Sequence, residues 1–238
     1  MNAVVIVTHS TSFFIEHQLN RIQNLCVDPV EILIIDNTPP EKSSISNEIL
    51  HTTQEYQATF AKTNYQHACG SFSHAPALNE GFREIKKRGF NRLLILDHDV
   101  IPFKKFHIES NYALEGLLQH RGKISYMCPA YINIDLNKIP QMDFLPTHIK
   151  GESTDTGGQL HHHIERLGQR EVRGIKQEHR HQGTDRFHEI LDTKMFHFIR
   201  GSNWGIPESP ALTEEQNKLK LQKLSQEFNI LSRDYKLA

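Results

Sequence analysis

The sequence has little cysteine, and the cysteines it has are scattered. Three occur among 238 residues, at Cys26, Cys69 and Cys128, and none belongs to a Cys-x-x-Cys pair. Such a sparse, odd set excludes a disulfide framework and a cysteine-based zinc or redox site. We interpret the three as small apolar residues of a protein in a reducing compartment.

Long apolar runs are missing as well. No stretch approaches the ~20 apolar residues that a membrane-spanning helix needs. The first ten residues, MNAVVIVTHS, have neither the basic lead nor the small-residue cleavage site of a signal peptide. We therefore expect a cytoplasmic protein without a transmembrane segment, with peripheral attachment to the inner membrane face as the alternative.

An excess of charge of one sign is the third absence. Lys and Arg number 27 against 28 Asp and Glu, so the formal net charge is −1. A near-neutral chain has no overall field that would concentrate it on nucleic acid, and we expect no nucleic-acid partner. Histidine, by contrast, is abundant, since eight of the 16 histidines lie from His148 to His197.

Short apolar runs alternate with helical patterns in the first half of the chain. Val4–Val7, Ile32–Ile35 and Leu93–Leu96 are continuous apolar runs, typical of strands buried on both faces. Between them, apolar residues recur every three or four positions over 15–26 and Ala75–Arg88, which predicts helices. The alternation predicts an α/β domain with a mixed, mostly parallel sheet flanked by helices.

The remaining segments carry weaker signals. We expect extended chain at Ala58–Ala61, a helix at Phe106–Gln119, an edge or bulged strand at Ser125–Ile132 because of Pro129, a short helix at Leu160–Leu167 and a last strand at Thr193–Ile199. From Thr213 the composition shifts to Glu, Gln, Lys and Leu. This shift predicts a helical tail over 211–238 that packs on the domain or on a partner.

All three strong strands end in polar residues. The ends are Thr8-His9-Ser10, Asp36-Asn37-Thr38 and Asp97-His98-Asp99. Ligands of parallel α/β sheets bind at the carboxyl ends of the strands. We therefore expect these three groups to converge on one crevice.

Asp97 and Asp99 form the sharpest motif. Two carboxylates two residues apart at a strand end can reach one hard divalent cation or its bound waters. A cation held there could bridge a diphosphate and neutralise charge on a leaving group. The alternative is an Asp-x-Asp that arose by chance and caps a turn.

Together these motifs resemble the GT-A glycosyltransferases of the large inverting family two. The matching segments are Val4–Thr8, Ile34–Thr38, Asn64 with Gly70 and Ala77–Gly81, Leu94–Asp99, Asp155–Leu160 with Arg166 and Gly168, and His197–Ser202. The first four cover about residues 3–102. Where the family usually has Glu-Asp, this chain has Thr154-Asp155.

The resemblance implies a GT-A fold and a metal-dependent, inverting transfer of a hexosyl or deoxyhexosyl group. The donor would be a nucleoside-diphosphate sugar, and the acceptor a hydroxyl of a glycan, a lipid-linked acceptor or a small molecule. The cofactor would be Mn²⁺ or Mg²⁺. Residues 1–210 would form one catalytic domain, with a nucleotide-sugar-binding half (1–102) and an acceptor half (103–210). The tail, 211–238, could support oligomers.

The resemblance also implies roles for single residues. Asp155 would be the general base, with Glu152, Asp185 and Asp192 as rivals. The donor would be contacted by Thr8, His9, Asp36, Asn79, Asp97 and Arg200. The metal would be held by Asp97, Asp99 and His197.

Each role has a structural alternative. Asp36 could form an Asx turn before two prolines, and Asn79 could orient a loop or lie in a helix as a plain polar residue. Asp155 could cap the helix that carries Leu160, and His197 could be a satisfied core histidine. Arg200, close to the only tryptophan, Trp204, could meet a phosphate or anchor the tail.

The histidine run His161-His162-His163 is a weaker metal candidate. Consecutive helical positions point apart, so all three cannot ligate one ion. We expect the run to be exposed and remote from Asp99. We expect His197, by contrast, to lie within about 5 Å of an Asp99 carboxylate, roughly the span of two metal–ligand bonds.

Three other functions fit parts of the sequence. A sugar-nucleotidyltransferase would carry a glycine-rich phosphate loop after the first strand, whereas 8–12 contains no glycine. A non-catalytic nucleotide-, sugar- or metal-binding module would have a degenerate site, whereas Asp97 and Asp99 are both present. A histidine-rich metal-binding protein would use the second half of the chain.

Overall fold

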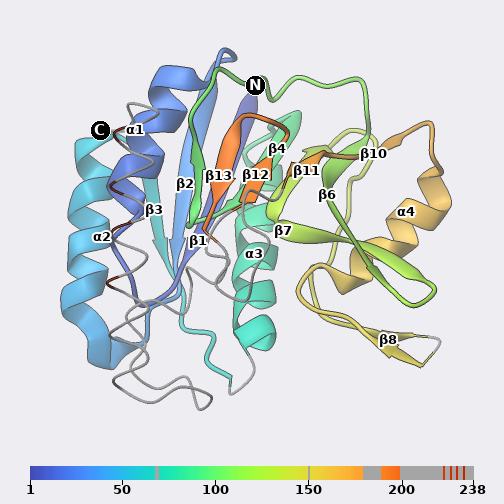
Figure 1. Cartoon of the computed structure of the whole chain (residues 1–238). Helices are drawn as coiled ribbons and strands as arrows, with labels where there is room; N and C mark the ends of the chain where they lie inside the picture. The colour runs from blue at the N-terminus through green and yellow to red at the C-terminus, as the bar shows by residue number, and fades with distance from the viewer. Residues whose placement is uncertain are drawn as a thin grey trace.

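The computed structural model describes residues 1–67, 70–149, 151–178 and 189–198, together with Gln222, Gln226, Asn229 and Arg233. Its main sheet has seven strands in the order β10-β6-β7-β4-β1-β2-β3 (Figure 1). Their bounds are β1 Asn2–Thr8, β2 Val30–Asp36, β3 Thr59–Lys62, β4 Arg92–Asp97, β6 Leu114–Arg121, β7 Ile124–Asp135 and β10 Val172–Gly174.

The sheet is mixed and mostly parallel. β1 pairs in parallel with β2 and β4, and β2 with β3. Among the strands described for this sheet, only β7 runs against its neighbours, β4 and β6. Helices flank the sheet on both sides (Figure 1). The predicted α/β class is therefore confirmed.

Side chains of β1 alternate between two apolar cores. Val5 and Val7 pack with residues of α3 (Gly70–Lys87), including Leu78. Val4 and Ile6 pack with residues of α1 (Ile15–Leu25) and with Ile49 of α2 (Ser43–Glu55). A strand covered on both faces must be apolar throughout, which is why the central runs carry no polar alternation.

A smaller antiparallel sheet lies beside the main one. Its order is β11-β12-β13-β5, with β5 Val100–Pro102, β11 Gln177–Glu178, β12 Glu189–Leu191 and β13 Met195–His197. The remaining elements are η1 Pro40–Lys42, β8 His148–Ile149, β9 Glu152–Ser153, η2 Gly158–Leu160 and α4 His161–Leu167. The expected helix at 160–167 and last strand at 193–199 correspond to α4 and β13.

The predicted helix at Phe106–Gln119 is wrong. Residues 114–121 form β6, which pairs antiparallel with β7. The buried guanidinium of Arg92 donates to the carbonyl oxygens of Ser110 and Tyr112, so it binds the backbone just before the strand. Tertiary pairing overrides a local helical pattern here.

Three further elements differ from the expectation or refine it. α2 has no counterpart among the predicted helices, and α3 begins at Gly70 rather than at Ala75. The register of β6 against β7 shifts between Gly116 and Leu117, so that Gly116 faces Ile132 and Leu117 faces Cys128. The bulge expected around Pro129 is therefore confirmed, although β7 is an inner strand rather than an edge.

Most of the predicted tail, 211–238, lies outside the described residues. Gln222, Gln226, Asn229 and Arg233 are helical and exposed. The division into 1–210 and 211–238 stays a prediction, as do the two halves of the domain. No helix in the described part of the chain is long and apolar enough to cross a membrane.

Candidate metal and active site

The polar ends of the central strands meet as the topology predicts. Thr8 lies opposite Asp36 in the register of β1 with β2, and Val7 lies opposite Asp97 in that of β1 with β4. Asp97 is the last residue of β4, and His98-Asp99 form the turn into β5. This turn therefore lies where the chain passes from the main sheet to the smaller one.

Gln18 of α1 holds this turn through two hydrogen bonds. Its buried side-chain amide donates to the carbonyl oxygens of Asp97 (2.8 Å) and Val100 (2.7 Å). The two acceptors lie on either side of Asp99. A single buried side chain therefore sets the conformation that presents both carboxylates, a role that the sequence pattern did not reveal.

His197 reaches the turn through strand pairing. β13 runs antiparallel to β5 with His197 opposite Val100, and the Phe198 N–H donates to the Asp99 carbonyl oxygen. The Nε2 atom of His197 lies 3.7 Å from Oδ1 of Asp99. The predicted proximity of His197 to Asp99 is confirmed.

Glu189 orients the His197 ring. Glu189 lies opposite His197 in the β12–β13 pairing, and its Oε1 is 2.7 Å from Nδ1 of His197. Its other oxygen accepts a hydrogen bond from Gln177. The carboxylate therefore fixes which imidazole nitrogen faces Asp99, as carboxylates behind metal-ligating histidines commonly do.

The buried charges perturb one another. Burial raises the pKa of Asp99, and it raises that of Asp97 to about 6. Burial alone would lower the pKa of His197, but the hydrogen bond with Glu189 and the Asp99 charge outweigh it and raise the pKa to about 9. Without a metal, His197 is therefore protonated at neutral pH.

His74 of α3 is a site residue that the sequence interpretation missed. Its Nε2 lies 3.4 Å from Oδ1 of Asp97. Burial lowers its pKa to about 4, so the ring is neutral at physiological pH. The early start of α3 explains the omission, because the expected helix began after this residue.

The donor set fits a divalent cation. Ligand atoms of Asp97, Asp99 and His197 all lie within 4.8 Å of one another. Oδ1 of Asp99 is buried and has no hydrogen-bond partner among the residues that the structure describes. A buried carboxylate oxygen without a hydrogen bond is costly. Two carboxylates suit Mn²⁺ or Mg²⁺, and the imidazole favours Mn²⁺ of the two.

Asp155 is exposed and lies in the same electrostatic neighbourhood. It accepts hydrogen bonds from Ser71 and from the Thr156 N–H. Its charge acts on the titration of both Asp97 and His74. Neither η2 nor α4 has a side-chain cap, so the alternative in which Asp155 caps the helix is wrong.

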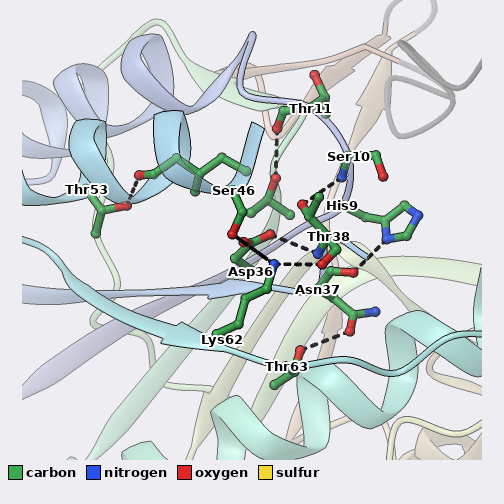
Figure 2. A network of polar contacts seen from close by, with 12 residues as sticks. His9, Ser10, Thr11, Asp36, Asn37, Thr38, Ser46, Thr53, Lys62 and Thr63 are labelled. Atoms are coloured by element: carbon green, nitrogen blue, oxygen red, sulfur yellow. Dashed lines mark hydrogen bonds and ion pairs between the residues drawn. The ribbon is translucent and has the colours of Figure 1, made fainter. Parts of the chain in front are cut away.

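The Asp36 corner is a closed polar network (Figure 2). Oδ1 of Asp36 accepts the Thr38 N–H at 2.9 Å, which is an Asx turn, and Oδ2 pairs with Lys62 at 2.7 Å and accepts from Ser46. The carboxylate is fully buried. Because the carboxylate is inaccessible, a contact between Asp36 and a nucleotide would require the surrounding side chains to move.

The remaining predicted donor residues are spread along the strand ends. Thr8 is buried and donates to the Thr11 carbonyl oxygen. Nδ1 of His9, a partly exposed residue, lies 2.9 Å from the Asn37 carbonyl oxygen (Figure 2). Asn79 binds Asp143 and the Phe144 N–H, so it orients a loop. Arg200 lies outside the described residues.

The histidine run needs a correction. His161 is buried, with a side chain only 3% exposed, whereas His162 is exposed. The expectation that the whole run is largely exposed is therefore wrong for His161. The run begins α4 directly after a 3-10 turn, and this places its first ring against the protein.

Comparisons with known proteins place the chain beside glycosyltransferases of known structure. No family model and no curated protein sequence matches it. The mannosyltransferase PcManGT from Pyrobaculum calidifontis, solved with GDP-Man and Mn²⁺, is 13% identical, with a TM-score of 0.47 over 73% of this chain and 54% of that one. The chain thus spans about half of that relative's length.

Two other glycosyltransferase structures show a similarly distant structural likeness to this chain. Glucosyl-3-phosphoglycerate synthase from Mycobacterium tuberculosis is 11% identical, with a TM-score of 0.45 over 73% of this chain and 68% of that one. The galactosyltransferase LgtC is 9% identical, with a TM-score of 0.35 over 59% and 60%. These names agree with the class that the sequence resembles. Likenesses this distant do not bear on substrate, metal or mechanism.

Burial of Asp97 predicts that the stability of the metal-free protein against unfolding depends on pH. Because its pKa is raised in the folded state, the native chain holds a proton that the unfolded chain has released between pH 4 and 6. Stability is therefore lost as the pH rises through this window. Asp97→Asn should unfold less readily than the wild type at pH 7.5 by on the order of 1–3 kcal/mol, with little difference at pH 4.

Urea denaturation in EDTA at both pH values measures this effect. Glu109→Gln, the same change of charge at an exposed residue, serves as the control. An equal effect of Asp97→Asn at pH 4 and pH 7.5, or none at either, would contradict the electrostatic account.

Proposed function

We propose that this protein is a metal-dependent glycosyltransferase. The observation that supports it best is Oδ1 of Asp99, which is buried beside Asp97 and His197 at the carboxyl ends of a mostly parallel sheet and has no hydrogen-bond partner among the described residues. This is the edge at which α/β sheets bind ligands. A hard cation between these side chains would satisfy the buried oxygen and attract a diphosphate.

We propose Mn²⁺ or Mg²⁺ as the resident ion, held by Asp97, Asp99 and Nε2 of His197. When bound, it supplies Lewis-acid stabilisation of the departing diphosphate. His197 must release its Nε2 proton to bind, and Glu189 keeps the ring in position by accepting from Nδ1. His74, neutral and close to Asp97, adds no competing positive charge at neutral pH.

The donor would be a nucleoside-diphosphate sugar lying along the strand ends. His9 is the partly exposed side chain of this edge and could meet the base or ribose. Thr8 and Asp36 shape the floor beneath it through their own hydrogen bonds, and Asn79 positions the loop at 143–144. Arg200 is proposed to meet a phosphate.

Asp155 would serve as the general base. An acceptor hydroxyl oxygen attacks the anomeric carbon from the face opposite the diphosphate, and its proton passes to the Asp155 carboxylate. The new carbon–oxygen bond forms as the bond to the diphosphate breaks, so the configuration inverts. The exposure of Asp155 leaves it accessible to a hexose-sized acceptor, and Ser71 holds one of its oxygens.

The rival functions gain no specific support from the site. The intact carboxylates argue against a degenerate binding module. The absence of glycine from 8–12 argues against a nucleotidyltransferase. The acceptor, the cytoplasmic location and any oligomer formed through the tail stay predictions.

The first test is metal-dependent nucleotide binding. In calorimetry with a panel of nucleoside diphosphates, the wild type should bind one of them in Mn²⁺ more tightly than in EDTA. Asp99→Asn should lose this metal-dependent gain, because repulsion between diphosphate and carboxylates is no longer bridged. The change should be at least about tenfold, the lower end of what loss of a residue behind a metal ligand costs. Asp135→Asn should bind like the wild type. A folded Asp99→Asn protein with unchanged affinity in Mn²⁺ would refute the assignment.

A second test addresses the base. Asp155→Asn should keep donor affinity while turnover falls by roughly 10²–10⁴-fold, the range for removal of a general base. Single-turnover sugar transfer measures the rate, and calorimetry with the donor measures affinity. A more acidic acceptor should recover part of the rate. Loss of donor affinity in step with turnover would instead make Asp155 a donor-binding residue.

A further inference from the structure

A second cluster of metal-ligand types lies at the start of α4. His161, His162 and Glu165 each offer one ligand atom, and these atoms all lie within 4.8 Å of one another. The cluster shares no residue with the Asp97, Asp99 and His197 group. We propose that it binds Zn²⁺ as a site distinct from the catalytic centre.

The geometry is close to that of a tetrahedral ion. Zinc–nitrogen and zinc–oxygen bonds of about 2.1 Å place two ligand atoms of one ion about 3.4 Å apart. Nδ1 of His161 lies 3.6 Å from Oε1 of Glu165, one helical turn later. The rings of His161 and His162 lie side by side, with centroids 4.3 Å apart. Small side-chain rotations would therefore complete a three-ligand set.

Burial divides the ligands into a fixed one and two adjustable ones. The His161 side chain is 3% exposed, so its position is set by the surrounding protein, whereas that of Glu165 is 57% exposed. His162 is also exposed, so two of the three ligands are open to solvent. The ion can therefore enter from solvent, and water can fill its fourth position.

His163 does not belong to this set, although it is the third histidine of the run. Its Nδ1 lies 3.2 Å from a guanidinium nitrogen of Arg166, on the following turn. The argument that three consecutive helical histidines cannot share one ion still holds, and two of them with Glu165 can. His163 therefore supplies a matched control within the same short helix.

Ligand chemistry separates the two sites. Two imidazoles and one carboxylate suit Zn²⁺, while two carboxylates and one imidazole favour harder ions such as Mn²⁺. α4 packs through Ile164 and Leu167 against the core that contains α3. An ion that joins its first turn would stabilise the folded state, because it binds the native chain better than the unfolded one.

The test is Zn²⁺ stoichiometry in the full chain. Equilibrium dialysis followed by elemental analysis should find one Zn²⁺ fewer in His162→Gln and in Glu165→Gln than in the wild type and in His163→Gln. Both substituted residues are exposed, so the variants should fold. Any zinc held at Asp99 or elsewhere is common to all four proteins and cancels in the comparison.

Thermal unfolding supplies an independent measurement. Zn²⁺ should raise the unfolding temperature of the wild type and of His163→Gln more than that of His162→Gln or Glu165→Gln. Equal stoichiometry and equal thermal shifts in all four proteins would overturn the proposal. That result would leave the glycosyltransferase assignment untouched, because the two sites share no residue.

Discussion

The candidate site depends on the pairing of β13 with β5. These two short strands are separated by about 90 residues in the chain, yet their register sets His197 opposite Val100 and brings the Phe198 N–H to the Asp99 carbonyl oxygen. Gln18 holds the other side of the same turn. A shift of one residue in this pairing would turn the imidazole to the opposite face of the sheet.

The turn buries two carboxylates close together, a costly arrangement that the protonated His197 offsets in part and that function can explain. Asp97 and Asp99 are raised in pKa by burial, and His197 stays protonated mainly because Glu189 binds it. Burying charges costs free energy unless they are paired and hydrogen-bonded, and Oδ1 of Asp99 lies 3.7 Å from His197 without a hydrogen bond from any described residue. Local destabilisation of this kind is typical of functional sites, and a cation bound between the carboxylates would remove it.

The sequence predicted what local pattern and topology determine. The buried runs that became β1, β2 and β4, and the polar groups at their ends, follow from periodicity and from the rule for parallel sheets. His197 came from a family resemblance and was found close to Asp99. The helix expected at 106–119 failed because pairing of β6 with β7 decided that segment.

Other residues could not have been found from local pattern. Glu189 reaches His197 only because β12 and β13 form a hairpin, and no sequence signal indicated that register. His74 required α3 to begin at Gly70, ahead of Pro76. The burial of His161 depends on the direction in which the 3-10 turn η2 leads into α4.

The central claim is that Asp99 and His197 share a metal ion, and crystallography of the full chain with Mn²⁺ tests it most directly. Anomalous scattering at the manganese edge should place one ion within about 2.0–2.6 Å of an Asp99 carboxylate oxygen, the range of metal–oxygen ligand bonds, with Nε2 of His197 as another ligand. The account would be contradicted by a crystal equilibrated with excess Mn²⁺ in which Asp99 forms a direct hydrogen bond with His197 and no anomalous peak lies between them.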